Sequence, residues 1–182
     1  MKPIQPMGVA KNAGVTVCQK ATNKMSVNGL ENQIIVIDHL PIRYEDYQRH
    51  FAGCLVITQS GQLLLQKRDN HCERFPGMLA TFGGQIDPGE TAEQGLIREL
   101  HEELGAQVSR DDLLAIGAIT KTGLDKALIH AYCWQDNKDS ITGCYEGSPA
   151  FFNSAIEILK QPNLTADAHW IVIECVKRQL IP

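Results

Sequence analysis

The chain has 182 residues, of which 43% are hydrophobic and 21% are charged, and its formal net charge is −4. This composition is sufficient for one globular domain with extensions. It excludes a membrane span, because no run of 18 apolar residues exists, and it argues against a nucleic acid polymer as partner, because there is no basic block.

The amino-terminal region predicts an extension followed by the domain itself. Residues 1–30 are rich in Gly, Asn, Lys and Thr, so we expect a loosely structured segment ahead of a single domain over 31–182. No apolar leader is present and the six cysteines contain no CxxC pair, which indicates free thiols and a cytoplasmic protein. Residues 32–41 are a strand candidate and 42–50 a short helix or turn, so 31–50 would add a strand or hairpin to the domain.

The middle of the chain predicts a hairpin, a loop and a helix. Two apolar runs at 50–57 and 62–68 flank the turn sequence TQSG, which is typical of a β-hairpin. A loop is expected over 69–77, and 78–86 predicts a strand broken at a pair of glycines. A helix then runs from about Thr91 to Leu104, with Gly105 as its carboxy-terminal stop.

The last third predicts two strands and two helices. The strands are expected at 113–120 and 127–134, and the helices at 149–161 and 164–179, with Thr165 as an N-cap. Strands, a helix, further strands and then helices favour an α/β (α+β) fold, in which helices flank a mixed sheet, over a doubly wound parallel sheet.

The helix over 91–104 carries a group of three carboxylates on one arc. At 100° per residue, Glu102 and Glu103 lie about −60° and +40° from Glu99, and the adjacent arc is apolar. We therefore expect these carboxylates at the edge of the core. Oxygen ligands gathered in this way suit Mg²⁺ or Mn²⁺, and a solvated acidic face is the alternative interpretation.

Small residues lie close to this carboxylate group in the sequence. Ala92 and Gly95 share the arc of Glu99, one to two turns upstream. Their small size leaves room either for a phosphate chain or for close packing of Gly95 against a neighbouring backbone. The preceding glycines, Gly83 and Gly84, predict a sharp turn and a close approach of the backbone to another group.

Eight residues at fixed spacing resemble the signature of the Nudix hydrolases. The family's box reads Gly, five residues, Glu, seven residues, Arg-Glu-aliphatic, one residue, Glu-Glu, one residue, Gly and an aliphatic residue. The matching residues are Gly84, Glu90, Arg98, Glu99, Leu100, Glu102, Glu103 and Gly105. Ala106, which is smaller than the usual aliphatic residue, is the one departure in the box over Gly84–Ala106. The resemblance covers residues 50–180 and implies a Nudix-type mixed β-sheet sandwiched between helices.

The resemblance implies a metal-assisted hydrolysis of a nucleoside diphosphate linked to another moiety. Glu99, Glu102 and Glu103 would hold Mg²⁺ or Mn²⁺ with the help of a backbone carbonyl near Gly83. Water would then attack a phosphorus atom, because a bound divalent cation activates water and neutralises charge on phosphate oxygens.

The remaining box residues would hold the loop. An ion pair of Glu90 with Arg98 would tie it to the helix, since the guanidinium fork matches a carboxylate.

Two roles stay open at the level of the sequence. The general base is either Glu102 or Glu103 in the box, or Glu146 in the stretch CYEGSPAFF, which resembles the loop that supplies a glutamate in MutT-type members. Lys67, Arg68 and Gly84 are candidates for contact with the diphosphate. The alternative for the two basic residues and for Glu146 is an ordinary exposed charge.

Several substrate classes fit this resemblance. A (deoxy)nucleoside triphosphate or an oxidised nucleotide is the first expectation, and ADP-ribose or a dinucleotide is the second. An isopentenyl-diphosphate-isomerase-like enzyme would need a cysteine where this chain reads ATFGG. A non-catalytic Nudix ligand sensor is a further alternative, although such domains often lose box glutamates. We expect a small-molecule nucleotide as partner and neither a nucleic acid polymer nor a membrane; a homodimer is left open.

Overall fold

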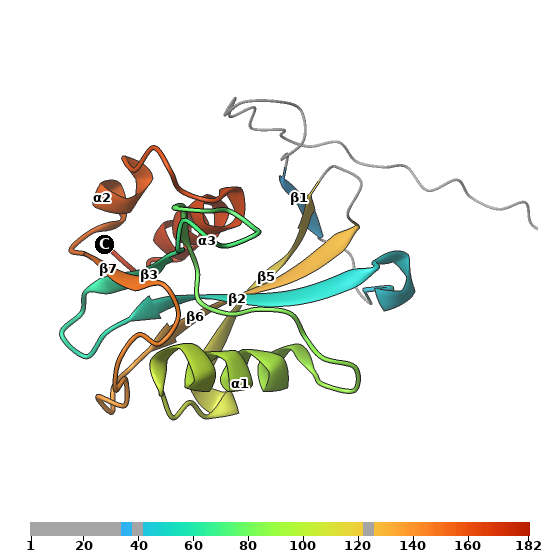
Figure 1. Ribbon diagram of the computed structural model, residues 1–182, viewed down its shortest axis with the longest axis horizontal. Coiled ribbons are helices and arrows are strands. Elements are labelled where there is room, and N and C mark those ends of the chain that lie inside the picture. Colours follow the sequence, from blue (N-terminus) through green and yellow to red (C-terminus); the bar gives the residue numbers. More distant parts are fainter. Residues whose placement is uncertain (1–33, 38–41, 122–125) are drawn as a thin grey trace, which may run out of the picture.

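The computed structural model describes residues 34–37, 42–121 and 126–182, and the expected extension at 1–30 lies outside them. Most of the described chain is organised around one β-sheet (Figure 1). The strands are β1 (Ile34–Ile37), β2 (Arg49–Ile57), β3 (Leu63–Lys67), β4 (Leu79–Ala80), β5 (Leu113–Lys121), β6 (Ala127–Gln135) and β7 (Ser148–Phe152). The helices are α1 (Ala92–Leu104), α2 (Ala155–Leu159) and α3 (Ala166–Lys177), with short 3₁₀ turns η2 (Tyr44–Asp46) and η3 (Arg110–Asp112).

The sheet is mixed, as the sequence predicts. Its strand order is β1-β5-β6-β2-β3-β4, and β7 pairs with β3. The central pair, β2 and β6, is parallel, whereas β2–β3, β3–β7, β5–β6 and β1–β5 are antiparallel. The predicted hairpin of 50–57 with 62–68 is confirmed by the β2–β3 pairing.

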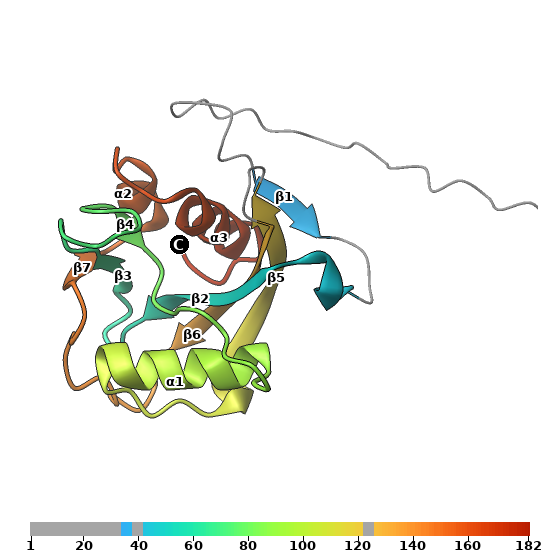
Figure 2. The ribbon, with the colours of Figure 1, turned by 45° about the vertical axis from the view of Figure 1, so that its right-hand side comes forward.

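Helices cover both faces of the sheet, because side chains alternate between faces along each strand. On β2, Cys54 and Val56 face the apolar stripe of α1, while Leu55 and Ile57 face α3. Figure 2 shows α1 on one side of the sheet and α2 with α3 on the other. The expected sandwich of helices around a mixed sheet is therefore confirmed, and α1 is fixed along one face by its leucines.

One segment differs from the sequence prediction, and one expected strand has a distant partner. The predicted helix at 149–161 is wrong in its first half, because Ser148–Phe152 forms β7 and only Ala155–Leu159 is helical. Backbone pairing of β7 with β3 over five residues outweighs the local helical pattern. The strand expected within 31–50 is present as β1, which pairs with β5 in antiparallel fashion.

The ends of the helices follow the expected signals with one exception. Thr91 caps α1 and Gly105 ends it in the left-handed region. Thr165 occupies the N-cap position of α3 with an extended backbone, but its buried hydroxyl has no hydrogen-bond partner.

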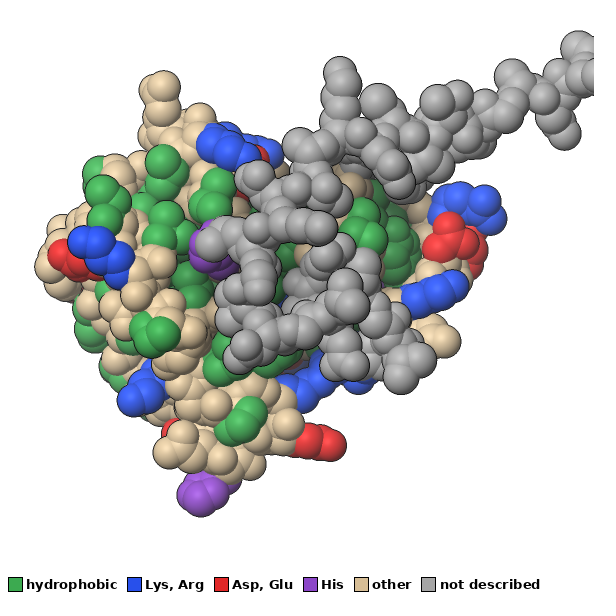
Figure 3. All heavy atoms as spheres, turned by 90° about the horizontal axis from the view of Figure 1, so that it is seen from above, with side chains coloured by type: hydrophobic (Ala, Val, Ile, Leu, Met, Phe, Trp, Pro, Cys, Tyr) green, Lys and Arg blue, Asp and Glu red, His purple; other side chains and the backbone are tan. Residues whose placement is uncertain are grey.

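No helix in the described ranges is long and apolar enough to cross a membrane. Where residues are described in the view of Figure 3, lysine and arginine side chains form small separate groups interspersed with acidic ones. This distribution agrees with the lack of a basic block in the sequence.

Candidate functional site

Local signals fix where the helix that carries the carboxylates begins and ends. The Thr91 hydroxyl accepts a hydrogen bond from the Gln94 backbone N–H, and the Gln94 side chain accepts one from the Thr91 backbone. This capping box fixes the first turn of α1. At the other end, the Gly105 N–H donates to the carbonyls of the last turn with φ of 62°. The register of the glutamates is thus set by residues adjacent to them in sequence.

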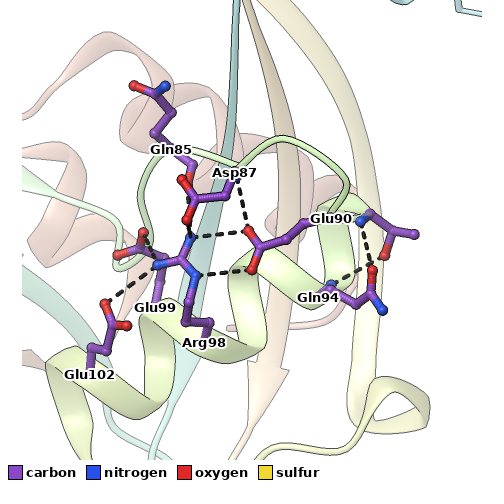
Figure 4. A network of polar contacts seen from close by, with 8 residues as sticks. Gln85, Asp87, Glu90, Gln94, Arg98, Glu99 and Glu102 are labelled. Atoms are coloured by element: carbon purple, nitrogen blue, oxygen red, sulfur yellow. Dashed lines mark hydrogen bonds and ion pairs between the residues drawn. The ribbon is translucent and has the colours of Figure 1, made fainter.

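Arg98 is the centre of the polar network around the loop that precedes α1 (Figure 4). Its Nε and Nη2 donate to the two oxygens of Glu90 at 3.0 and 3.1 Å, and Nη2 also donates to the Gln85 carbonyl at 3.0 Å. The pair expected between Glu90 and Arg98 is therefore present and bidentate. Because Arg98 and the Asp87 N–H both donate to Glu90, the pKa of the Glu90 carboxyl is lowered.

The three box carboxylates differ in their exposure to solvent. The Glu103 residue is 3% exposed, the Glu99 side chain 17% and the Glu102 side chain 57%. This gradient agrees with the helical wheel, in which Glu103 lies next to the apolar stripe. Nη1 of Arg98 donates to Glu99 at 2.8 Å and to Glu102 at 3.4 Å.

Glu103 is held by two donors from outside the helix. One carboxylate oxygen accepts from the Gly83 N–H at 2.7 Å, and the other accepts from Nε2 of Gln66 at 2.7 Å. Burial raises the pKa of Glu103 to about 8, with the charge of Glu146 adding to the shift and the two donors opposing it. Burial likewise raises the pKa of Glu99, opposed by Arg98.

The glycines before the helix allow the backbone to approach these carboxylates. Gly83 has φ of 121°, and a Cβ atom there would overlap the Ala52 carbonyl of β2. At Gly84, a Cβ would lie 2.6 Å from the Glu99 carboxylate. A side chain at either position would therefore displace the loop from β2 or from α1.

Gly95 serves close packing rather than providing room for a phosphate chain. A Cβ at Gly95 would lie 3.1 Å from the Glu90 carboxylate and 3.4 Å from the Ile86 backbone. Of the two interpretations that the sequence left open, the structure therefore supports packing against the loop.

A second group of candidate residues lies where β3 meets the loop before β7. Nη1 of Arg68 lies 3.8 Å from the carboxylate of Glu146, whose side chain is 54% exposed. The charges of Glu146 and Glu103 are close enough to raise the pKa of Glu103. Lys67 ends β3 with an exposed side chain, and within the described ranges its ammonium group forms no hydrogen bond or ion pair.

Gln66 is the site residue that sequence reasoning missed. It is 1% exposed, and its Nε2 donates to Glu103 and, at 3.3 Å, to the Glu146 carbonyl. Its Oε1 accepts from Arg68 at 3.1 Å. The one signal in the sequence is a polar residue within the apolar run LLLQK, where a buried amide needs partners.

The carboxylate oxygens of Glu99, Glu102 and Glu103 are the type of ligand that a hard divalent cation prefers. Burial raises the pKa of Glu99 and of Glu103, and a nearby cation would favour the ionised form of both carboxylates. In the observed arrangement Glu99 and Glu102 point to Arg98 instead, and the described residues contain no three His, Cys, Asp or Glu side chains placed to hold a metal ion. Binding would therefore require these two carboxylates to turn away from the guanidinium.

The sequence of this chain matches a known protein family. A family model described as NUDIX domain matches residues 47–152, more than half of the chain. Curated relatives include the nucleoside triphosphatase NudI of Salmonella agona and of Salmonella arizonae, each 42% identical over 60 residues. The match spans 33% of this chain and 43% of each relative, so less than half of their length is compared.

Solved structures share the fold at low sequence identity. The MutT protein from Methanosarcina mazei Go1 superposes with a TM-score of 0.58 and 19% identity, covering 72% of this chain and 94% of that one. A mutT/nudix family protein from Listeria innocua gives 0.59 and 21%, with coverage of 74% and 95%. The NUDIX domain of Shewanella oneidensis NrtR, solved in complex with ADP ribose, gives 0.58 and 18%, with coverage of 72% and 88%.

Proposed function

The chain belongs to the NUDIX domain family, and from this premise we propose that it is a Mg²⁺- or Mn²⁺-dependent pyrophosphohydrolase of nucleotides. The observation that carries the proposal is the buried carboxylate of Glu103, held between the Gly83 N–H and Gln66 beside Glu99. A buried, hydrogen-bonded carboxylate with a raised pKa is typical of a functional site. We propose that it acts on a nucleoside triphosphate, the substrate class named for the NudI relatives.

The metal would be held by the box. Glu99, Glu102 and Glu103 would supply carboxylate oxygens, and the Gly83 carbonyl a further one. Mg²⁺ bound there would activate water and neutralise charge on the phosphate oxygens.

The loop before α1 would act as the rigid part of the site. The bidentate pair of Arg98 with Glu90, and the bond from Arg98 to the Gln85 carbonyl, keep the loop in register with the helix. Such fixed positioning lowers the entropy lost when reacting groups are brought together.

We propose Glu146 as the general base. Both oxygens of Glu103 already accept hydrogen bonds from protein donors, whereas the Glu146 side chain is 54% exposed and accessible to water. A base must lie within hydrogen-bond reach of the water that it deprotonates. Lys67 and Arg68, at the end of β3, would bind the phosphates of the substrate and offset their charge.

The test is release of phosphate or pyrophosphate from a panel of ribo- and deoxynucleoside triphosphates, 8-oxo-dGTP and ADP-ribose, with and without Mg²⁺. We expect turnover only with the cation. Glu102→Gln should lose turnover and keep its circular dichroism spectrum, whereas Glu174→Gln in α3, on the opposite face of the sheet, should retain wild-type turnover. Hydrolysis that does not need a divalent cation would contradict the proposal.

Two further outcomes would redirect the assignment. Preferential hydrolysis of ADP-ribose, the ligand of the NrtR domain, would assign the dinucleotide class instead of the triphosphates. Binding of nucleotides without release of phosphate from any of them would favour a ligand sensor.

The role of Glu146 as general base is tested separately. Glu146→Gln should lower kcat while leaving Mg²⁺ affinity unchanged. A normal kcat in this variant would favour Glu102 or Glu103 of the box as the general base.

A further inference from the structure

The loop that carries Glu146 is attached to the helix of the box and to the sheet. The N–H of Thr142 donates to the Leu104 carbonyl at 3.0 Å, and the N–H of Tyr145 donates to the Glu103 carbonyl at 2.8 Å. The loop therefore lies against the carboxy-terminal end of α1 (Figure 1). It then leads into β7, which pairs with β3. These contacts hold the residues on either side of Glu146.

Gln66 on β3 contacts both this loop and the box through one amide nitrogen. Its Nε2 donates to the Glu103 carboxylate at 2.7 Å and to the Glu146 carbonyl at 3.3 Å. An amide nitrogen carries two hydrogens, so both are used, one on each of the two glutamates. Because Gln66 is only 1% exposed, water does not compete for these two bonds. The Gln66 amide therefore bridges the carboxylate of one glutamate and the backbone of the other.

Arg68 determines which way round the Gln66 amide lies. Oε1 of Gln66 accepts from Nη1 of Arg68 at 3.1 Å, and Nε of Arg68 donates to the Arg74 carbonyl at 2.9 Å. A guanidinium has donors and no acceptor, so the amide oxygen faces Arg68 and the amide nitrogen faces Glu103. The same Nη1 lies 3.8 Å from the carboxylate of Glu146. The bridge made by Gln66 thus has a single orientation.

The hydrogen bonds of the Gln66 side chain go to residues that the proposed reaction uses. Glu103 is a proposed metal ligand, Glu146 the proposed base and Arg68 a proposed phosphate contact. Leu64, the preceding residue on the same face of β3, packs in the apolar core against α1. An apolar residue at position 66 would suit that core, because a buried polar group costs free energy unless it is hydrogen-bonded. The contacts with the site residues therefore account for an amide at this position.

We propose that Gln66 is a positioning residue, which holds Glu146 at a fixed place relative to Glu103. The proposal rests on the proposed function, in which Glu103 is a metal ligand and Glu146 is the general base. A base must lie within hydrogen-bond reach of the water that it deprotonates. The Gln66 amide sets the separation between the two glutamates on which this reach depends, and it acts through them.

The first test follows the loop itself, without substrate or metal. Hydrogen–deuterium exchange of the full chain should be faster over residues 142–147 in Gln66→Met than in the wild type, because the Glu146 carbonyl loses a donor. Gln62→Met is the matched control: this glutamine precedes β3 and donates to Asn153 at 3.3 Å, so exchange over 142–147 should stay at wild-type rates. Equal exchange rates over this loop in the wild type and Gln66→Met would overturn the proposal.

The second test separates positioning from a purely structural role, by steady-state kinetics with a nucleoside triphosphate at saturating Mg²⁺. Gln66→Met should lower kcat by about tenfold to a hundredfold and leave KM unchanged. In the Glu146→Gln background it should cause little further loss of kcat, because residues that act as a unit are not additive. Losses that multiply would overturn the proposal. A normal kcat with weakened Mg²⁺ affinity would also overturn it, since Gln66 would then support Glu103 alone.

Gln66→Glu is the second variant and covers the case in which the apolar replacement does not fold. Its ionised carboxylate keeps the size of the amide and the bond from Arg68, but it has no donor for Glu103 or Glu146, so the same loss of kcat and the same faster exchange are expected. Failure of the proposed function would look different. A wild type that hydrolyses no nucleotide, or a normal kcat in Glu146→Gln, would contradict the hydrolase or the base assignment, and the exchange rates would then decide by themselves whether Gln66 holds the loop.

Discussion

Replacing Glu103 by Gln should remove a pH dependence that the buried carboxylate gives to the stability of the metal-free protein. Burial raises the pKa of Glu103 in the folded chain to about 8, from an ordinary value of 4.5. Between these two values the folded chain retains a proton that the unfolded chain has lost. Stability therefore falls as the pH rises through this window, and it is highest below the lower value.

The size of the effect follows from the two pKa values. Between pH 5 and pH 8 this one group should lower the free energy of unfolding by about 3 kcal/mol. That is a large part of the roughly 5–15 kcal/mol available to a folded domain. Glu103→Gln has no ionisable group, so this decrease should disappear. The variant should lose about 1 kcal/mol at pH 5, because an amide cannot accept from both the Gly83 N–H and Gln66.

The assay is urea-induced unfolding at pH 5, 6, 7 and 8 in the presence of EDTA. The wild-type and Glu103→Gln curves should converge and then cross as the pH rises. Glu102→Gln provides the matched control, because this side chain is 57% exposed and its replacement should preserve the wild-type pH dependence. Parallel curves for wild type and Glu103→Gln across this range would refute the reasoning from burial.

Three further predictions concern the loop, the ion pair and the metal. Gly83→Ala should lower the free energy of unfolding in urea by about 3 kcal/mol or more, because the methyl group would overlap a backbone carbonyl of β2. The control is Gly61→Ala, which has a positive φ but open space around it, and it should lower the free energy of unfolding by about 1–2 kcal/mol. Arg98→Lys should lower Tm and reduce kcat/KM by on the order of tenfold to a hundredfold in a nucleotide assay, since lysine cannot hold Glu90 in bidentate fashion; unchanged kcat/KM would contradict the positioning role. Mg²⁺ at a hundred times its Kd should stabilise the wild-type protein by about 2.7 kcal/mol in thermal melts, and the same concentration should stabilise Glu102→Gln less. Equal stabilisation of both proteins would argue against the Glu102 carboxylate as a metal ligand.

The strongest sequence predictions were those that depend on neighbouring residues. Thr91 and Gly105 bound α1 because capping is local, and the box spacing places three carboxylates on one arc because the helical repeat is fixed. The burial gradient from Glu102 to Glu103 also follows from this arc, since the adjacent arc carries the leucines. Local pattern was insufficient for 149–161, where pairing of β7 with β3 overrides a helical sequence.

The sequence by itself therefore determined the mixed fold, the bounds of α1 and the grouping of its carboxylates, because these depend on periodicity and on contacts within a few residues. Only the tertiary structure decided what touches those carboxylates. The bonds to Glu103 come from Gly83 and Gln66, which lie 20 and 37 residues away along the chain. The stacking of the Tyr44 ring on both His50 and His130 likewise depends on two strands becoming neighbours in the sheet. Contacts of this range are set by how the whole sheet pairs, which no short stretch of sequence encodes.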